Sequence, residues 1–168
     1  REKSQGNRVH GFADGFRGLN QNVKTYFDQD DIDDGPGSLL KTSYDFVNVD
    51  EAVKNITGLD RLYCICGNES MKSARDLALD DRVDTNIIGI AKTVFNDMPG
   101  LESLGFQTAI QELARYIDCA YIEAVSTNSI VFLEVPGRGN SELVVHAGLA
   151  RNSKITNVIT PETKVDYR

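Results

Sequence analysis

The sequence predicts an α/β fold with a mainly parallel sheet, and two observations lead to this prediction. From residue 48 onward, short and nearly continuous apolar runs alternate with amphipathic stretches of helical period. Turn-forming Gly, Pro and Asn residues separate the two kinds of segment. Apolar strands that alternate with amphipathic helices are typical of a parallel sheet covered by helices on both faces, in three layers.

The composition sets the class of protein and excludes several functions. The chain has 168 residues, of which 40% are hydrophobic and 26% charged, as expected for one globular domain over residues 1–168. Its formal net charge is −7, whereas a general binder of nucleic acid or of a membrane surface needs a basic surface. Its longest apolar stretches, about five residues, are far shorter than the roughly 20 of a membrane span.

The chain has three cysteines, an odd number that does not suit a disulfide framework. Free thiols are typical of a reducing compartment, so we expect a cytoplasmic protein. Cys64 and Cys66 alternate within an apolar run, which favours buried structural thiols over a zinc site, since the chain has only two histidines.

The amino-terminal third shows few regular patterns. Residues 8–12 read as a short strand, and the glycines after it predict a loop around Leu19. The first clear helix begins after Asn48 or Asp50, either of which suits a helix N-cap, and it ends at Gly58.

Four strands alternate with three further helices in the rest of the chain. The strands are expected at residues 62–66, 86–90, 129–135 and 155–159. The helices are expected at residues 71–79, 106–121 and 141–150. Ligands bind beyond the carboxyl ends of the strands in such sheets, so the loops that follow the strands are the expected site. These loops are residues 67–70, 91–99, 136–140 and 160–162.

The first of these loops, Gly67-Asn68-Glu69-Ser70, joins a strand to the start of a helix. Free backbone N–H groups and the helix dipole favour an anion there, and a glycine lets a phosphate approach closely. The alternative is that Asn68 or Ser70 only caps the helix.

The second loop carries a recognisable motif. Residues 91–98 read Ala-Lys-Thr-Val-Phe-Asn-Asp-Met, which resembles the Pro-(Gly or Lys)-Thr-Ile-Asp-Asn-Asp-Ile motif of the 6-phosphofructokinase family, ATP- or pyrophosphate-dependent. Five further segments resemble family motifs in the same order: residues 15–19, 66–70, 105–109, 134–138 and 161–162. The resemblance covers nearly the whole chain and implies a Rossmann-like, three-layer phosphofructokinase-type domain with a mainly parallel sheet.

The resemblance extends over only about half of a typical family member. The family's first glycine-rich loop would precede Arg1, and the last part of its sugar-phosphate site would follow Arg168. We therefore expect the central part of a longer chain, with both ends missing.

The family's reaction, in glycolysis, is phosphoryl transfer from ATP or pyrophosphate to fructose 6-phosphate with Mg²⁺. The first Asp of the second-loop motif is the family's general base, and Phe95 occupies that position here. A phenyl ring accepts no proton, so we expect an inactive or strongly impaired chain. Thr93 and Asp97 remain as catalytic candidates. Asp97 is expected to organise magnesium or a sugar hydroxyl, and an Asx turn before Pro99 is the alternative.

The donor phosphates are expected at Gly67, Asn68, Glu69, Ser70 and Lys92. Asn68 replaces the family's magnesium-associated Asp, so Mg²⁺ binding is expected to be poor. Glu69 together with Lys92 resembles the pyrophosphate-dependent branch, although some ATP-dependent members also carry the Lys. A surface ion pair is the other explanation for these charges.

Fructose 6-phosphate is expected to bind at Gly137, Arg138 and Glu162, because these residues match the family's arginine loop and its Pro-Glu motif. Arg suits bidentate phosphate binding. His146 lies on a predicted helix among apolar residues, where a core or interface role is favoured over a catalytic one.

Three functions stay open on the sequence alone: a working phosphofructokinase, a non-catalytic regulatory or structural module, and a folded fragment without a ligand. We also expect self-association, or a missing partner half, through exposed helix faces around Val144 and Ala147.

Overall fold

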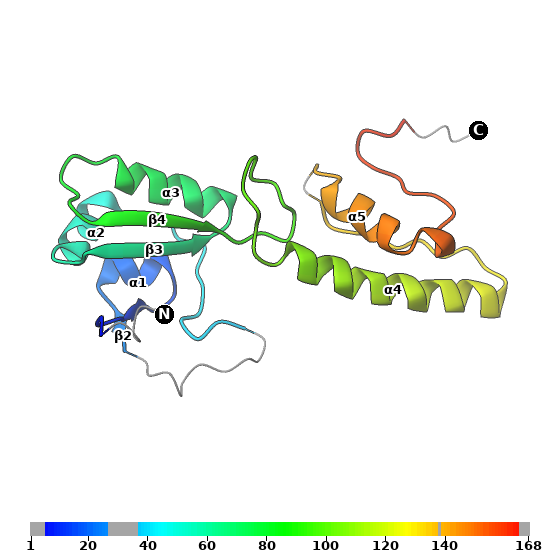
Figure 1. Cartoon of the computed structure of the whole chain (residues 1–168), viewed down its shortest axis with the longest axis horizontal. Coiled ribbons are helices and arrows are strands. Elements are labelled where there is room, and N and C mark those ends of the chain that lie inside the picture. The colour runs from blue at the N-terminus through cyan, green and yellow to red at the C-terminus, as the bar shows by residue number, and fades with distance from the viewer. Residues whose placement is uncertain (1–5, 27–36, 138, 165–168) are drawn as a thin grey trace. The chain divides into compact units, whose positions relative to one another are not determined.

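The computed structural model describes residues 6–26, 37–137 and 139–164, and the chain divides into two compact units (Figure 1). Unit 1 comprises Arg1–Ile65 and Glu69–Gly89, and unit 2 comprises Cys66–Asn68 and Ile90–Arg168. Each unit buries apolar side chains of its own, such as Ile56 and Leu77 in unit 1 and Ile117 and Leu143 in unit 2.

Unit 1 begins with an antiparallel pair of short strands, β1 (Gly11–Phe12) and β2 (Lys24–Thr25). The helix α1 (Phe16–Gln21) connects them, so the prediction of a loop around Leu19 is wrong. Leu19 is buried, and a Cβ on Gly18 would overlap the carbonyl oxygen of Ala13. The burial of Leu19 stabilises this helix, although a glycine within a helix by itself lowers the stability of the helix.

The helix α2 (Val49–Ile56) follows the prediction. The Asn48 side chain caps it, since its Oδ1 accepts a hydrogen bond from the Glu51 N–H at 3.4 Å. Ala52 and Ile56 are buried on one face, and the helix ends just before Thr57.

Two parallel strands, β3 (Arg61–Cys66) and β4 (Asn86–Ala91), form the second sheet. The Asn86 N–H donates to the Asp60 carbonyl at 3.2 Å, and the Lys92 N–H donates to the Cys66 carbonyl at 3.0 Å. In both bonds the donor and the acceptor residue are the same number of positions apart in the sequence, as parallel pairing requires. The prediction of both strands is confirmed.

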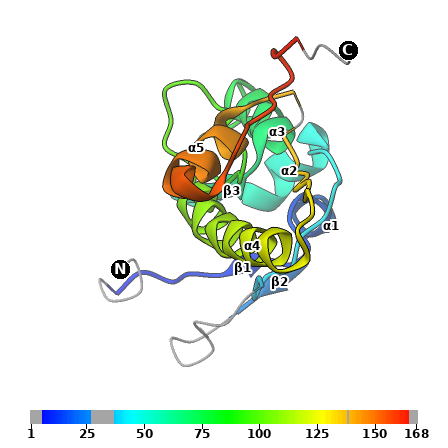
Figure 2. The ribbon, with the colours of Figure 1, turned by 90° about the vertical axis from the view of Figure 1, so that its right-hand side faces the viewer.

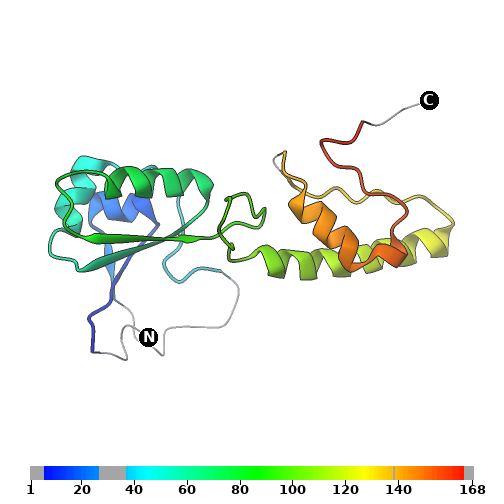
Figure 3. The same ribbon diagram turned by 45° about the horizontal axis from the view of Figure 1, so that its top comes forward.

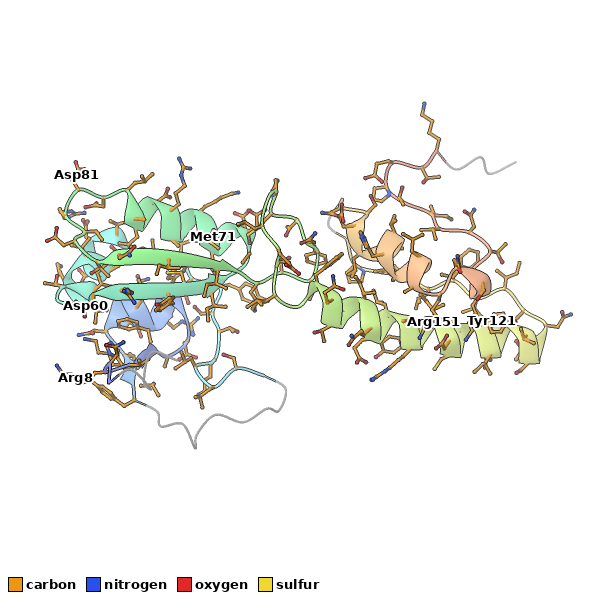
Figure 4. All side chains as sticks on the ribbon, in the orientation of Figure 1. Arg8, Asp60, Met71, Asp81, Tyr121 and Arg151 are labelled. Atoms are coloured by element: carbon orange, nitrogen blue, oxygen red, sulfur yellow. The ribbon has the colours of Figure 1, made fainter. Side chains whose placement is uncertain are left out.

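The helix α3 (Asn68–Ala78) connects β3 to β4 and lies along one side of the sheet (Figure 3). It begins three residues before its predicted start at residue 71. Met71, labelled in Figure 4, packs against β4, because a Cβ on Gly89 would come within 2.6 Å of its sulfur. On β3, however, Tyr63 and Ile65 are exposed, so the described residues do not cover both faces of this sheet.

Unit 2 is built on α4 (Phe106–Thr127) and α5 (Glu142–Ala150), which lie side by side (Figures 1 and 2). Both helices were predicted, and α4 continues six residues past its expected end at residue 121. Ala147 is buried and Val144 is half-buried. The prediction that the helix face around them is exposed is therefore wrong.

The short 3-10 helix η3 (Asn152–Lys154) fastens the end of α5 to α4. The Asp118 carboxylate accepts hydrogen bonds from Arg151 Nε at 3.0 Å and from Lys154 Nζ at 2.8 Å. The Lys154 ammonium also lies 5.8 Å from the ring centre of Tyr121, which Figure 4 labels near Arg151.

The two strands predicted at residues 129–135 and 155–159 are not formed. Both segments are apolar runs that suit a strand, but a strand also needs a neighbour to accept and donate its backbone hydrogen bonds. Over the described ranges, no neighbouring strand pairs with either segment. None of the helices described is long and apolar enough to cross a bilayer.

Candidate functional site

The loop predicted to bind an anion is even tighter than the sequence suggests. β3 ends at Cys66 and α3 begins at Asn68, so Gly67 alone connects the strand to the helix. The first N–H groups of α3 have no partner within the helix, as at any helix start. Among the described atoms, a Cβ on Gly67 would come within 4 Å only of the Lys92 carbonyl oxygen, at an ordinary contact distance of 3.6 Å. The packing of the protein itself thus does not require a glycine here.

Glu69 lies in the first turn of α3, where it forms a surface ion pair. Its Oε1 is 3.0 Å from Lys72 Nζ, one turn further along the same helix, and both side chains are largely exposed. Such exposed pairs contribute only about 0.3–0.5 kcal/mol. Because Glu69 lies in the first turn of α3, its negative charge opposes an anion bound at the helix start.

Lys92 lies beside the end of β3 through its backbone. Its N–H donates to the Cys66 carbonyl, and the Leu104 N–H donates to the neighbouring Ala91 carbonyl at 2.9 Å. Burial raises the pKa of the Cys66 thiol, and the Lys92 charge only partly offsets the effect. The thiol therefore stays protonated at neutral pH.

Of the three thiols, Cys64 is buried, Cys66 is half-buried and Cys119 is exposed. The prediction of buried thiols thus holds for Cys64 and in part for Cys66, and it does not concern Cys119 on α4. In the part of the chain that the structure describes, no three His, Cys, Asp or Glu side chains come together as a metal site.

The second loop is held in shape by two hydroxyl groups. Thr93 Oγ1 accepts a hydrogen bond from the Phe95 N–H at 3.1 Å, which forms a turn at the motif. The buried Ser103 hydroxyl donates to the Thr93 carbonyl at 2.7 Å. No sequence signal points to Ser103, because it lies ten residues from Thr93 and outside the motif.

Asp97 has an unsatisfied carboxylate oxygen. Its Oδ1 is shielded from solvent and accepts no hydrogen bond from any residue that the structure describes. The Asx turn that the sequence offered as an alternative would supply such a bond, so this oxygen does not take part in one. A buried anionic oxygen without a donor costs free energy, and a ligand that supplies a donor or a cation would offset that cost.

The third and fourth loops meet within unit 2. Glu162 Oε1 accepts a hydrogen bond from the Ser141 hydroxyl at 3.2 Å, just before α5. Hydrogen bonds from the Thr160 side chain, from its own backbone N–H and from Ser141 lower the pKa of Glu162. This side chain is therefore ionised and oriented at neutral pH.

Gly137 allows the tight turn of the third loop. Its carbonyl accepts the Asn140 N–H at 2.8 Å, and a Cβ at this position would come within 2.6 Å of the Asn140 carbonyl oxygen. The Asn140 Oδ1 then accepts the N–H of Glu142, the first residue of α5, at 2.7 Å, just before the N-cap residue Ser141. Arg138, the predicted sugar-phosphate ligand, lies outside the described residues.

An open hollow of about 530 Å³ lies elsewhere in unit 2, between the loop after Asp97 and the starts of α4 and α5. Its lining includes Met98, Phe106, Glu142 and His146, and none of the predicted site residues. The His146 ring packs edge-on against Phe106 at 5.3 Å, and its Nδ1 lies 2.8 Å from the Glu142 carbonyl oxygen. These contacts are those of a residue that packs one helix against another.

Comparisons with known proteins cover the whole chain. The sequence profile of the family described as Phosphofructokinase matches residues 1–168. An "ATP-dependent 6-phosphofructokinase" from Corynebacterium efficiens is 31% identical over 175 residues, covering 96% of this chain and 49% of the relative. The "ATP-dependent 6-phosphofructokinase 1" of Arabidopsis thaliana is 32% identical over 153 residues, covering 85% of this chain and 32% of the relative.

A solved structure has the same fold. The phosphofructokinase of Pichia pastoris in the T-state superposes with a TM-score of 0.84 at 26% identity, over 96% of this chain and 18% of that chain. This chain spans about a third of the Arabidopsis relative and about half of the Corynebacterium relative. Because the family profile matches from the first residue to the last, the chain belongs to the phosphofructokinase family.

Proposed function

We propose that this chain is a phosphofructokinase-type domain that keeps the loop for the donor phosphates but has lost the base for phosphoryl transfer. The reaction in question is transfer from ATP or pyrophosphate to fructose 6-phosphate, in cytoplasmic glycolysis. The observation that carries the proposal is Phe95, whose ring stands where the family motif has an Asp.

A base must accept the proton of the attacking hydroxyl as the new bond forms. Phe95 has no lone pair to offer, and Thr93, two residues before it, already accepts the Phe95 N–H. Loss of a general base costs about 10²–10⁴-fold in rate. The ring also adds an apolar group where phosphate charge has to be stabilised.

The donor loop, in contrast, keeps the features that bind an anion. Gly67 leaves the start of α3 open, and the described packing gives no other reason for a glycine at this position. The Lys92 backbone lies beside the end of β3, and the Lys92 charge acts on the Cys66 thiol, directly before the loop. Glu69 opposes the anion, so we expect binding of phosphate in the millimolar range, about 1–10 mM.

Magnesium fits this site only together with phosphates. Mg²⁺ is usually bound through one or two carboxylates plus substrate phosphate oxygens. Asp97 offers one carboxylate oxygen that has no partner among the described residues, and Asn68 offers a neutral amide in place of the family's Asp. A magnesium ion would neutralise phosphate charge when it is bound, and Asp97 is the residue of this chain that suits it.

The observations on the phosphoryl donor point in two directions. The two curated relatives named above are ATP-dependent by name, which favours ATP. Glu69 and Lys92 favour pyrophosphate by resemblance to that branch. On the acceptor side, the ionised Glu162 and the tight turn at Gly137 suit a sugar hydroxyl and a sugar phosphate, together with Arg138.

A coupled assay tests the proposal with both donors. The chain is incubated with fructose 6-phosphate, Mg²⁺ and either ATP or pyrophosphate, and fructose 1,6-bisphosphate is measured next to a complete 6-phosphofructokinase as positive control. We expect turnover far below about 1 s⁻¹, the low end for kinases. Turnover at or above that rate with either donor would refute the loss of catalysis.

A further inference from the structure

The apolar side chain nearest to the start of α3 is that of Met71. The fully buried residues of this helix begin only at Ser73. In the turn before it, Asn68, Glu69 and Lys72 are exposed, whereas Met71 is half-buried. Met71 is therefore the first side chain of α3 through which the helix packs against the sheet by apolar contact.

The Met71 thioether fills room that a glycine leaves on β4 (Figure 4). A Cβ on Gly89 would come within 2.6 Å of the Met71 sulfur and within 3.2 Å of its terminal methyl carbon. The sulfur and the methyl group thus pack directly on the backbone of the strand. Such close apolar contact is lost when the group that makes it becomes larger and polar.

We propose that Met71 is an oxidation-sensitive contact, whose conversion to methionine sulfoxide by hydrogen peroxide releases the start of α3 from β4. A lone pair of the Met71 sulfur attacks one oxygen of the peroxide, and the O–O bond breaks. The sulfur loses two electrons and keeps that oxygen, while the other oxygen takes up the proton of the first and leaves as water. The polar sulfoxide no longer suits the apolar contact with Gly89.

The release also acts on the donor loop, and this consequence rests on the proposed function. Gly67 alone connects β3 to α3, so the free N–H groups of the helix start have a fixed place only while the first turn of α3 is held. Oxidation of Met71 would therefore lower the affinity of the loop for phosphate. The loosening of α3 itself depends on no ligand.

The chain offers an internal comparison for the oxidation step. It has two methionines, Met71 and Met98. Met98 is only 7% exposed, whereas Met71 is half-buried and lies against Gly89, which is exposed. Peroxide has to reach the sulfur, so Met71 should be oxidised at least about fivefold faster than Met98.

Peroxide treatment of the full chain tests the proposal, followed by dithiothreitol to reduce oxidised thiols. Mass spectrometry of peptides measures oxidation at each methionine. Hydrogen exchange measures the amides of residues 71–74, which donate to the first carbonyls of α3 as in any α-helix. After oxidation these amides should exchange at least about tenfold faster, while the amides of α2 keep their rates. Methionine sulfoxide reductases for both epimers should restore slow exchange.

Two variants separate Met71 from the other oxidisable residues. Met71→Leu keeps an apolar side chain of similar size and should show slow exchange before and after peroxide. The matched control Met98→Leu removes the other methionine and should respond to peroxide as the wild type does. In a phosphate titration, the oxidised wild-type chain should bind at least about threefold more weakly than the reduced chain. A reduced chain that binds no phosphate would refute the proposed function and leave the exchange result to decide the role of Met71.

The proposal is overturned if exchange at residues 71–74 stays unchanged once Met71 is fully oxidised. It is also overturned if Met98 is oxidised as fast as Met71. A Met71→Leu chain that responds to peroxide like the wild type would equally contradict it, because the effect would then belong to another residue.

Discussion

At the residue scale, this chain treats the two acidic positions of the family's second-loop motif differently. Phe95 replaces the first acid, and Asp97 keeps the second, with one buried oxygen that has no donor in the part of the chain that the structure describes. The surrounding loop is nevertheless well held, by the Ser103 hydroxyl on the Thr93 carbonyl and by the Phe95 N–H on Thr93. On the proposed function, the loop keeps its shape for a ligand while Phe95 offers no group that could take a proton.

Glu69 offers a residue-scale prediction about anion affinity. Its carboxylate lies in the first turn of α3 and repels an anion at the same helix end. Glu69→Gln should tighten phosphate binding about 2–5-fold, which corresponds to about 0.5–1 kcal/mol for one charge at a helix end. The matched control is Glu51→Gln on α2, which removes the same kind of ion pair, Glu51 with Lys54 at 2.9 Å, far along the chain from the loop. Equal effects of the two variants in a phosphate titration would contradict the assignment.

His10 predicts a pH dependence of stability. Burial lowers the pKa of His10 below its ordinary value, with the Lys24 charge as a second cause, and its Nε2 is buried without a partner in the described structure. The unfolded chain thus binds a proton more readily than the folded chain. The neutral ring makes its full contribution to stability above the pKa that His10 has in the unfolded chain, near 6.5. This contribution is lost as the pH falls below that value.

Urea unfolding at pH 7.5 and 5.5 checks this prediction, in a window above the range where carboxyl groups titrate. The wild-type chain should lose stability toward pH 5.5. His10→Phe keeps a ring against Phe12 and Tyr26, 5.5 and 5.7 Å away in the wild type, and should flatten the dependence. An unchanged slope in the variant would show that another group is responsible.

At the scale of elements, α1 depends on close packing at Gly18. A methyl group there would overlap the Ala13 carbonyl, whereas a methyl group on Gly67 meets only an ordinary contact with the Lys92 carbonyl. Gly18→Ala should therefore lower the free energy of unfolding by about 1–3 kcal/mol. Gly67→Ala, the matched control, should stay within about 1 kcal/mol of wild type. Equal urea midpoints for the two variants would contradict the packing seen at α1.

The elements also show how far the sequence alone reaches. The helices α2, α4 and α5 and the strands β3 and β4 were predictable, because their apolar period and their caps are local. The helix α1 was not, since Gly18 disfavours a helix and the burial of Leu19 depends on the rest of the unit. Residues 129–135 and 155–159 have the composition of strands but lack a described partner, and pairing is a non-local property.

The candidate site was predictable to the same extent. The motifs located the loops, and the structure places Gly67 at a helix start and Glu162 beside Ser141. The hydrogen bond of Ser103 and the Asp97 oxygen that has no donor among the described residues were not readable, because each depends on residues that only the fold brings together.

At the scale of the whole molecule, the chain carries the fold of its family over 96% of its length while spanning 49% of the Corynebacterium relative. Its net charge of −7 opposes anions in general, so phosphate binding has to come from local N–H groups and from Lys92. The central claim is therefore that the loop at residues 67–70 still binds phosphate although the chain cannot transfer it.

A titration with phosphate, followed by the backbone amide resonances of the ¹⁵N-labelled chain, tests that claim most directly. The amides of Gly67 to Met71 should shift and saturate with a dissociation constant of about 1–10 mM. Gly67→Ala should weaken this binding, because its methyl group obstructs the approach of a phosphate without disturbing the packing. Amides at residues 67–71 that do not move at about 50 mM phosphate, well above the expected constant, would contradict the account and leave the loop with a capping role alone.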